Sequence, residues 1–371
     1  MKQTIRFCTA PDGVKLAYAV SGDGPPLVMS ATWLTDLESQ GRSLAWQPWL
    51  EAFSPDHTLL SHDSRGCGLS DRDPGDLSFE AWIRDFESVI DAAEFQQFSI
   101  LAACQHGAVA IEYAARHPER VRKIVLYGTY SLGRVLRHNP PVETEKTRVV
   151  ASLLRLGWAQ DNALLQIWAH AFQPEGTIEH WHSWCDFQRV ATSAETATRM
   201  VEIGWNVDVR NAARKIKCPV LILHPEGDQV VPIEEGRALV SLIPGSRFIE
   251  IDSKNHMPLA DEPAWPRLVS EIRSFLAEAA LAIPARSHEL PVDELTPREL
   301  SVLEGIAEGM DNAELAASLG VSEKTVRNHI TRIFDKIRVK HRYEAIVLAR
   351  EAGFGANSRL TRVRKSHFGS D

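Results

Sequence analysis

Short apolar runs alternate with amphipathic helical stretches along most of the chain. Six runs rich in Val, Ile and Leu lie at residues 25–30, 57–63, 98–103, 122–128, 220–225 and 248–252. Runs of this length and composition are typical of strands that are buried on both faces of a parallel sheet. Helical patterns lie between several of them, for example over 79–94 and 108–117. The alternation predicts a doubly wound α/β domain over residues 1–280.

The strand pattern stops between about residues 131 and 215 and then resumes at residue 218. The intervening segment has a mostly helical pattern. It holds five tryptophans, Trp158, Trp168, Trp181, Trp184 and Trp205. A helical insertion between two strands of one sheet is expected to form a lid. Together with Trp33, these tryptophans favour an apolar pocket lined by aromatic side chains under that lid.

The pattern changes again after residue 280. Two prolines and little periodicity mark a linker over 281–294, and the polar, basic tail at 356–371 is expected to be disordered. Between them, residues 295–355 have the pattern of a small all-α module.

The helix boundaries of this module can be read from its end signals. Its first helix starts with Thr296, Pro297 and Glu299, which form a capping box with proline at the first helical position. A second helix starts at Asn312 and ends at Gly320. A third starts at Ser322, and its apolar side chains recur at helical spacing, which predicts that they face inward. These are Val326, Ile330, Ile333 and Ile337.

Charge is distributed unevenly. The whole chain has a net charge of −8, with 44% hydrophobic and 24% charged residues, the balance of a globular protein. From Val321 to Asp371, however, twelve Lys and Arg face only five Asp and Glu. A small basic end on a large acidic body indicates an appendage that binds a polyanion such as DNA.

Several classes of protein are disfavoured. No run of eighteen apolar residues predicts a membrane span, and the first residues lack the pattern of a secretory signal, so we expect a cytoplasmic protein. The five cysteines are odd in number and widely spaced, which argues against a disulfide framework and a zinc site. We therefore expect neither a metal nor a cofactor.

The all-α module resembles the LuxR-type helix-turn-helix family over roughly sixty residues. The resemblance rests on LTPRE at 295–299, on SEKTVRNHI at 322–330 and on the last helix. It implies four helices, the third of which enters the major groove, and a homodimer on a two-fold-related DNA site. The implied contacts to base edges are Arg327, Asn328 and Thr331, with Lys324, Thr325 and Arg332 on the same face. The implied contacts to phosphate are Lys336, Lys340 and Arg342.

Residues 1–280 resemble the α/β-hydrolase superfamily over its whole length. The stretch HDSRGCGLSD at 62–71 matches an early loop of the superfamily. HPEGDQVVP and KNHMPL match the loops that carry the catalytic acid and histidine, which places these at Asp228 and His256. Aligning the helix that follows the nucleophile places Cys104 where the superfamily usually has serine, in the order nucleophile, acid, histidine. A thiolate held by His256 could serve as nucleophile.

The flanks of Cys104 depart from the superfamily's G-x-S-x-G motif. Ala102 and His106 replace its two glycines, and we expect the His106 imidazole to be crowded there. The oxyanion hole would use the N–H of Gln105 and one from the loop Ala31-Thr32-Trp33, which lacks the usual glycine. Cys104 is thus either a nucleophile or a buried apolar residue in an inactive elbow.

Two functions follow from these resemblances. In the first, the hydrolase-like domain binds a small apolar or aromatic ligand and so changes DNA binding. The candidate ligand contacts are Trp33, Gln105, His106, Trp158 and Trp205, beside Cys104, Asp228 and His256. In the second, Cys104, His256 and Asp228 hydrolyse esters or lactones, and the attached domain regulates transcription.

Overall fold

The computed structural model describes residues 3–30, 33–137, 140–158, 163–278, 294–337, 339 and 342–355. The chain divides into two compact units, the first formed by residues 1–236 and 247–279 and the second by residues 237–246 and 280–371. The predicted tail at 356–371 and all of the predicted linker except Glu294 lie outside the described residues.

The first unit is built on an eight-stranded sheet with the order β1-β2-β4-β3-β5-β6-β7-β8. Its strands are β1 (Thr4–Thr9), β2 (Lys15–Ser21), β3 (Pro26–Ser30), β4 (Thr58–His62), β5 (Phe98–Ala103), β6 (Val121–Tyr127), β7 (Val220–Pro225) and β8 (Arg247–Ile251). From β4 to β8 all pairings are parallel, whereas β2 is antiparallel to both of its neighbours. All six predicted strands are confirmed. β1 was not predicted because it is an edge strand with mostly exposed side chains, and β2 was not predicted although most of its side chains are buried.

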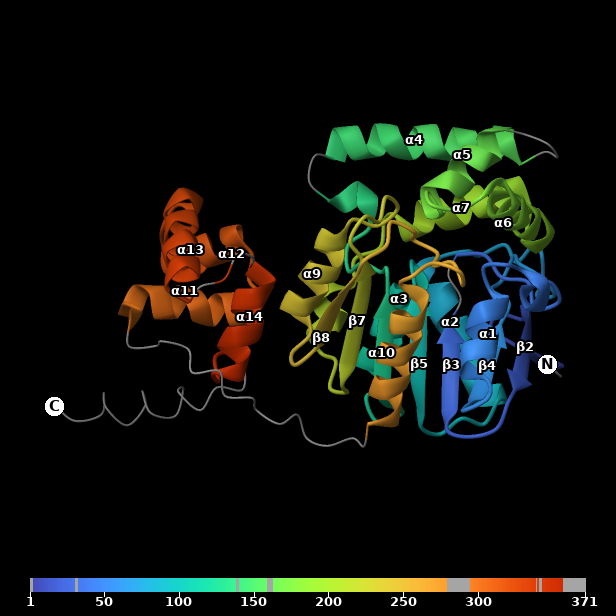
Figure 1. Cartoon of the computed structure of the whole chain (residues 1–371), viewed down its shortest axis with the longest axis horizontal. Helices are drawn as coiled ribbons and strands as arrows, with labels where there is room; N and C mark the ends of the chain where they lie inside the picture. The colour runs from blue at the N-terminus through green and yellow to red at the C-terminus, as the bar shows by residue number, and fades with distance from the viewer. Residues whose placement is uncertain are drawn as a thin grey trace. The chain divides into compact units, whose positions relative to one another are not determined.

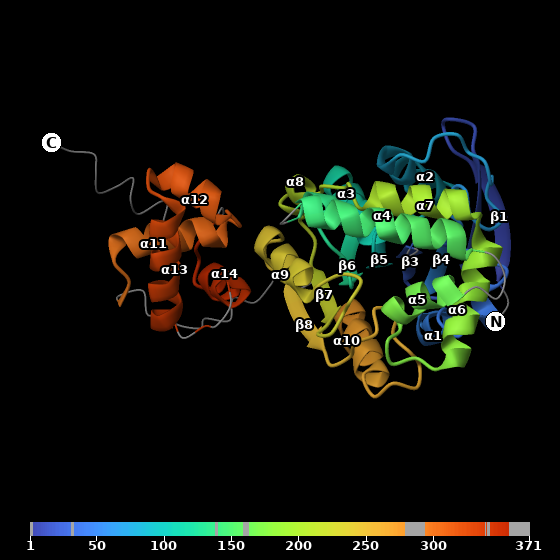
Figure 2. The same cartoon turned by 90° about the horizontal axis from the view of Figure 1, so that it is seen from above.

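Helices cover both faces of this sheet. Its non-lid helices are η1 (Gln40–Arg42), α1 (Gln47–Phe53), α2 (Phe79–Ala92), α3 (His106–Arg116) and α10 (Trp265–Ala277). Helix α9 (Ile233–Leu242) begins in this unit, and its residues from 237 onward belong to the second unit. Helices α1 and α10 lie on one face, and α2 and α3 lie on the other (Figures 1 and 2). The predicted α/β fold is therefore confirmed, and α2 and α3 match the helical patterns of the sequence.

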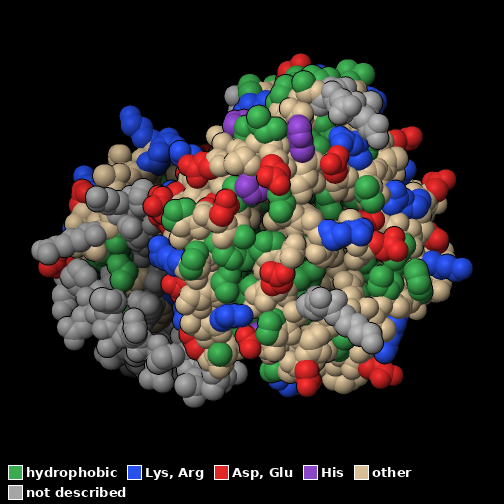
Figure 3. Space-filling view, turned by 45° about the vertical axis from the view of Figure 1, so that its right-hand side comes forward, with side chains coloured by type: hydrophobic (Ala, Val, Ile, Leu, Met, Phe, Trp, Pro, Cys, Tyr) green, Lys and Arg blue, Asp and Glu red, His purple; other side chains and the backbone are tan. Residues whose placement is uncertain are grey.

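The predicted lid is present as a helical segment between β6 and β7. Its helices are η2 (Arg134–Leu136), α4 (Pro140–Gly157), α5 (Ala163–Phe172), α6 (Ile178–Ala191), α7 (Ala194–Gly204) and α8 (Arg210–Ala213). Helices α4 to α7 lie together above one end of the sheet (Figure 1). Large exposed apolar side chains are concentrated here, including Val149, Leu156 and Ile167, and Figure 3 shows hydrophobic side chains over this surface. A surface of this kind is a candidate contact area for another protein.

The motif at 62–71 has a structural task in this fold. Arg65 is completely buried, and its guanidinium donates to Asp85 at 2.6 Å and to Asp12 at 2.8 Å. The Asp63 carboxylate accepts the N–H of Leu69 at 2.8 Å, and a side chain on Gly68 would collide with it at 2.1 Å. Buried charges require such partners. The motif therefore locks a loop in place.

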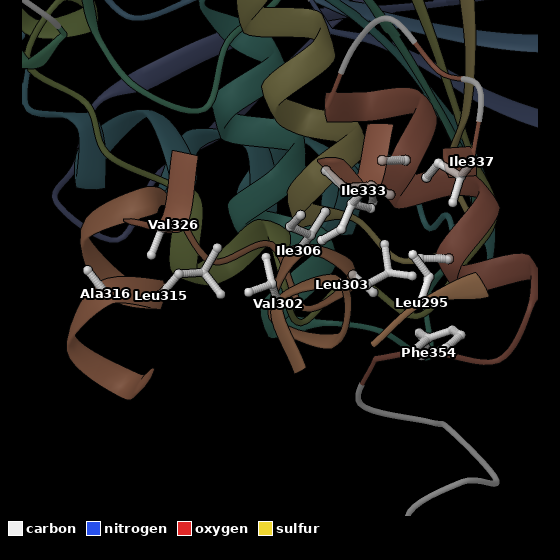
Figure 4. Close-up of a cluster of buried hydrophobic side chains, with 14 residues drawn as sticks. Leu295, Val302, Leu303, Ile306, Leu315, Ala316, Val326, Ile333, Ile337 and Phe354 are labelled. Carbon is white, nitrogen blue, oxygen red and sulfur yellow. The ribbon is translucent and has the colours of Figure 1, made fainter. Parts of the chain in front are cut away.

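The second unit contains the four predicted helices. They are α11 (Pro297–Ala307), α12 (Asn312–Leu319), α13 (Glu323–Ile337) and α14 (Arg342–Glu351). The capping box of Thr296 and Glu299 is formed, and Gly320 has the left-handed conformation at φ 64°. Figure 4 shows the buried apolar cluster of this unit, in which Val302, Ile306 and Ile333 are fully buried. Ile330, predicted to face inward, is partly buried against the same cluster.

The described residues contain neither a membrane-spanning helix nor a cluster of metal ligands. No helix there combines the length and the apolar character needed to cross a bilayer. No group of three or more His, Cys, Asp and Glu among those residues is arranged to hold a metal ion. All five cysteines are free thiols.

Candidate functional site

Cys104 lies on a sharp turn between β5 and α3. Its backbone has φ of 52°, a left-handed conformation that a cysteine rarely adopts. Two hydrogen bonds hold the turn: the Cys104 N–H donates to the Tyr127 carbonyl at 3.1 Å, and the Thr129 hydroxyl donates to the Cys104 carbonyl at 2.5 Å. The strained turn matches a nucleophile elbow, which presents a side chain at the end of a strand and at the start of a helix.

His256 and Asp228 complete a chain of contacts with Cys104. His256 Nδ1 lies 2.7 Å from Asp228 Oδ2, and the neighbouring Cys104 side chain raises the pKa of His256. The other Asp228 oxygen accepts the N–H groups of Val230 and Val231, each at 2.8 Å. Asp228 thus orients the imidazole and is itself fixed by its own loop. The structure brings all three predicted catalytic residues together.

The charge state of His256 follows from its neighbours. Burial lowers the pKa of His256, but the charges of Asp228 and Cys104 and their hydrogen bonds raise this pKa to about 10. His256 is therefore an imidazolium at neutral pH, and its proton is available to a group that binds beside Cys104. Cys104 and His256 together match the residue types of a cysteine–histidine nucleophile pair.

His106 does not crowd the elbow as we expected. Its side chain turns into the core, where it lies against Trp82 with ring centroids 5.9 Å apart and near His62 at 6.3 Å. Burial and the nearby His62 lower the pKa of His106 to about 3, so the imidazole is neutral. The close helix-to-strand contact falls at Gly107, where an added Cβ would lie 2.0 Å from Thr129 Oγ1. His106 is therefore a core residue and not a ligand contact.

A small cavity of about 30 Å³ lies over Cys104. It is lined by Trp33, Cys104, Gln105, Tyr130, Arg134, Arg137, Trp168, Phe172, Val201, Trp205, Val230 and Val231. Its walls come both from loops at the carboxyl ends of the strands and from the lid. By volume it has room for about two water molecules. A larger ligand must displace lid side chains to enter.

Three of the predicted ligand contacts line this cavity, namely Trp33, Gln105 and Trp205. Trp158 does not line it but packs edge-on against Trp33 at 6.4 Å and donates its indole N–H to the Thr192 carbonyl. Trp33 also packs against Trp168 and Phe172, each among the lining residues, at 5.8 Å and 6.4 Å. The predicted aromatic wall is thus present, with Trp158 behind it.

The sequence analysis missed the polar part of the lining. Arg134, Arg137 and Tyr130 follow β6 and line the cavity. Their only sequence signal was their position after a strand that ends at the site, which by itself does not reveal where a side chain points.

The oxyanion hole is only partly visible. Gln105 is the N-cap residue of α3, so its N–H belongs to the free amide groups at the helix start. Such groups stabilise negative charge. Ala31 and Thr32 of the second expected loop lie outside the described residues.

The exposed face of α13 carries the predicted base-reading side chains. Lys324, Arg327, Asn328, Thr331 and Arg332 are all exposed, whereas Val326 and Ile333 on the opposite face are buried. Thr325 is half-buried, and its backbone N–H donates to the Ser322 hydroxyl at the helix start. The face is therefore polar, basic and open to a ligand, as a recognition helix requires.

The three predicted phosphate contacts differ from this face. Lys336 Nζ lies 2.7 Å from Glu299 Oε2 and donates to the Glu294 carbonyl at 2.9 Å. Arg342 donates to the Asn312 side chain at 3.0 Å and to the Met310 carbonyl. Both cations therefore serve internal contacts of this unit, which argues against the phosphate roles expected of them. Lys340 lies outside the described residues.

Comparison with known proteins supports both parts of this description. Residues 293–349 match the model of the luxR family of bacterial regulatory proteins, and residues 25–167 match the model of the α/β-hydrolase fold. Among solved structures, the chain is similar to an esterase from Rhodococcus sp., with a TM-score of 0.59, 24% identity and coverage of 74% of this chain and 98% of the esterase. That similarity establishes the fold alone.

Curated relatives match the two parts separately. Pyrrolizixenacetamide deacetylase of Xenorhabdus hominickii is 25% identical over 269 residues, which cover 71% of this chain and 94% of that enzyme. The 2-hydroxymuconate semialdehyde hydrolase of Pseudomonas sp. is 25% identical over 73% of this chain and 93% of that enzyme. The transcriptional regulatory protein LiaR of Bacillus subtilis is 36% identical over 36% of this chain, which spans 61% of that regulator. The chain therefore joins a domain of the α/β-hydrolase fold to a carboxy-terminal domain that matches the luxR family of bacterial regulatory proteins, and this second domain supports a DNA-binding transcriptional regulator.

Proposed function

We propose that the hydrolase-fold domain is a sensor whose occupied pocket changes the DNA affinity of the LuxR-type domain. The observation that carries the proposal is the small cavity over Cys104, whose walls include the lid residues Trp168 and Val201. A ligand larger than the cavity binds only if the lid rearranges. Binding then selects a different lid conformation, and such a change is what couples a ligand site to a second site.

DNA recognition in this proposal uses the exposed face of α13. Arg327 and Asn328 are exposed there and have the donor groups that read guanine and adenine edges. We further propose that two copies bind a two-fold-related site, as expected for a helix-turn-helix protein. If the protein has the molecular mass of one chain both when free and when bound to DNA, the dimer is removed from this proposal.

A substitution that fills the cavity tests the sensor. Val201 on α7 lines the cavity and is 4% exposed, whereas Val190 on α6 is 56% exposed and lies outside it. We expect Val201→Phe to change the dissociation constant for an operator selected in vitro at least fivefold, the lower end of typical allosteric coupling. Val190→Phe is the matched control and should have no effect. Equal affinities for wild type and Val201→Phe would contradict the sensor, provided that both bind DNA.

A second candidate function is hydrolysis of an ester or lactone, favoured by the contacts among Cys104, His256 and Asp228. The Cys104 sulfur would attack the carbonyl carbon, and the bond to the alcohol oxygen would break as His256 gives that oxygen a proton. Water would then attack the thioester carbon while His256 takes a proton from it, and cleavage of the carbon–sulfur bond would release the acid and return Cys104 and His256 to their starting protonation states.

Turnover of p-nitrophenyl acetate separates the two candidates. If the protein is an enzyme, p-nitrophenol release continues over many turnovers and is abolished in Cys104→Ala. It should persist in Cys67→Ala, because Cys67 is buried but does not line the cavity. A single burst without turnover, together with an effect of Val201→Phe on DNA affinity, favours the sensor.

A further inference from the structure

Two arginines give the cavity over Cys104 a cationic side. Arg134 and Arg137 come from the segment that follows β6, and both line the cavity with side chains that are only 17% and 13% exposed. Arginines are seldom buried without a purpose, because desolvation of a charge is costly. Neither residue takes part in the contacts among Cys104, His256 and Asp228, so their function needs a separate explanation.

Both guanidinium groups are held on aromatic faces. Arg137 lies over the Tyr130 ring at 5.2 Å, and Arg134 lies over the Trp205 ring at 5.7 Å. Tyr130 is fixed in turn, because its hydroxyl donates to the Gly204 carbonyl at 2.9 Å. Stacking on a rigid ring pre-organises the planar guanidinium for a ligand.

Each arginine has a carboxylate partner, but its donor groups are not exhausted. Arg137 Nε donates to the Leu132 carbonyl at 2.9 Å and lies 3.0 Å from Glu235. Arg134 Nε lies 3.5 Å from Glu143, and its Nη2 donates to the Val230 carbonyl at 3.3 Å.

The remaining donors are those that a ligand could use. Within the described part of the chain, the terminal nitrogens of Arg137 and Nη1 of Arg134 donate to no protein acceptor. Glu143 and Glu235 are not among the described residues that line the cavity. The cavity therefore faces the two cations and not their counter-ions.

The two cations also act on each other. Burial and the nearby positive charge of Arg137 both lower the pKa of Arg134. An anion bound between them would relieve this repulsion and accept the remaining donors. A carboxylate matches the fork of a guanidinium, with two oxygens for two N–H groups.

We propose that the pocket binds a ligand with a carboxylate group. Arg134 and Arg137 bind the carboxylate, while the acyl carbon of the ligand faces Cys104. This inference rests on the proposed function, because it names the chemistry of the molecule that the same pocket senses. The apolar part of the ligand lies against Trp33 and Phe172, which also line the cavity. Two cations and several aromatic rings in one lining make the pocket selective for an amphipathic acid.

Alkylation of Cys104 with a matched pair of reagents tests this inference in the full-length protein. Iodoacetate and iodoacetamide differ in one anionic group, and each forms a bond from the sulfur to its methylene carbon with loss of iodide. The rate of alkylation at Cys104 is measured by mass spectrometry for each reagent. The ratio of the iodoacetate rate to the iodoacetamide rate is then divided by the same ratio measured for glutathione in the same buffer. We expect this normalised ratio to fall at least fivefold in the double variant Arg134→Gln/Arg137→Gln.

The controls separate charge from folding. Arg120 is 19% exposed, pairs with Asp91 and lies over the Phe98 ring, but it does not line the cavity, so Arg120→Gln should keep the wild-type ratio. Arg134→Lys/Arg137→Lys should keep at least half of the wild-type normalised ratio, because both positive charges are retained. If the double glutamine variant does not fold, Arg137→Gln alone is measured, with an expected fall of at least threefold.

A fall in the normalised ratio smaller than these values, or a Cys104 that reacts with neither reagent, would overturn the carboxylate proposal. The sensor proposal fails on a different result: the normalised ratio falls as expected, but carboxymethylated and unmodified protein bind the selected operator with equal affinity.

Discussion

The pocket and the recognition helix use polar side chains in opposite ways. Around Cys104, the groups of His256 and Asp228 are buried and joined by short hydrogen bonds. On α13, Arg327 is exposed, and its ion pair with Glu323 is 3.4 Å long with both side chains more than half exposed. Exposed pairs of this kind contribute little stability. Substitutions in the pocket should therefore affect folding and chemistry together, whereas those on α13 should affect DNA binding alone.

The largest effect is expected at Asp228. Asp228→Ala removes the partner of His256 and the acceptor for the N–H groups of Val230 and Val231. Breaking a buried charged pair costs about 3–5 kcal/mol of unfolding free energy. Urea denaturation of the full-length protein measures it. Asp228→Asn keeps an acceptor for the loop, so it should lose less unfolding free energy than the alanine variant. A loss below about 1 kcal/mol for Asp228→Ala would show that the pocket is not the rigid region we describe.

On the recognition helix, Arg327→Ala should leave stability within about 0.5 kcal/mol of wild type. Its affinity for the selected operator should nevertheless fall about tenfold to a hundredfold, the range for a lost base-edge contact. A DNA-binding titration and a urea denaturation of the same variant check both parts. Equal operator affinities for wild type and Arg327→Ala would remove α13 from the interface.

Lys336 lies on the same helix but should behave like a pocket residue. Its ammonium neutralises Glu299, which is 3% exposed, and holds the pKa of that carboxyl at about 2. Lys336→Ala is expected to destabilise the smaller unit by about 1–3 kcal/mol, since it leaves a buried carboxylate without its partner.

Hydrogen exchange in peptides from 295–337 measures this loss locally. Lys324→Ala, which removes an exposed lysine of the same helix, is the control and should leave exchange unchanged. If Lys336 contacts phosphate instead, exchange in Lys336→Ala stays at the wild-type rate and the salt dependence of DNA binding becomes shallower.

A smaller effect is expected from pH. The pKa of His256 is raised to about 10 in the folded protein from an ordinary 6.5, so protonation stabilises the fold below pH 6.5 and this stabilisation is lost as the pH rises through 10. Cys104→Ala removes one cause of the raised pKa. Between pH 7 and pH 10, the unfolding free energy of the variant should therefore fall by about 1 kcal/mol less than that of wild type. Parallel stability curves for the two proteins would indicate that Cys104 and His256 are not coupled.

The sequence predicted what local patterns determine. The capping box at Thr296 and the turn at Gly320 involve residues a few positions apart, and the buried strands follow from composition. The candidate catalytic residues Cys104, Asp228 and His256 were predicted from motifs that each occupy one loop.

What the sequence missed depends on distant contacts. His106 packs against Trp82 and His62 from other segments, and Lys336 pairs with a residue 37 positions away. Arg134 and Arg137 enter the cavity because Tyr130 and Trp205 support them. Neither periodicity nor spacing encodes which of several loops will meet, so these contacts emerge only from the folded chain.

The most direct test of the central claim is operator affinity measured before and after Cys104 is alkylated with iodoacetate. Cys104→Ala, treated in the same way, accounts for alkylation at other cysteines. If the pocket controls the DNA-binding domain, the alkylated wild type differs from the untreated wild type at least fivefold in dissociation constant, and treated and untreated Cys104→Ala do not differ. Unchanged affinity in wild type after complete alkylation of Cys104 would contradict the account.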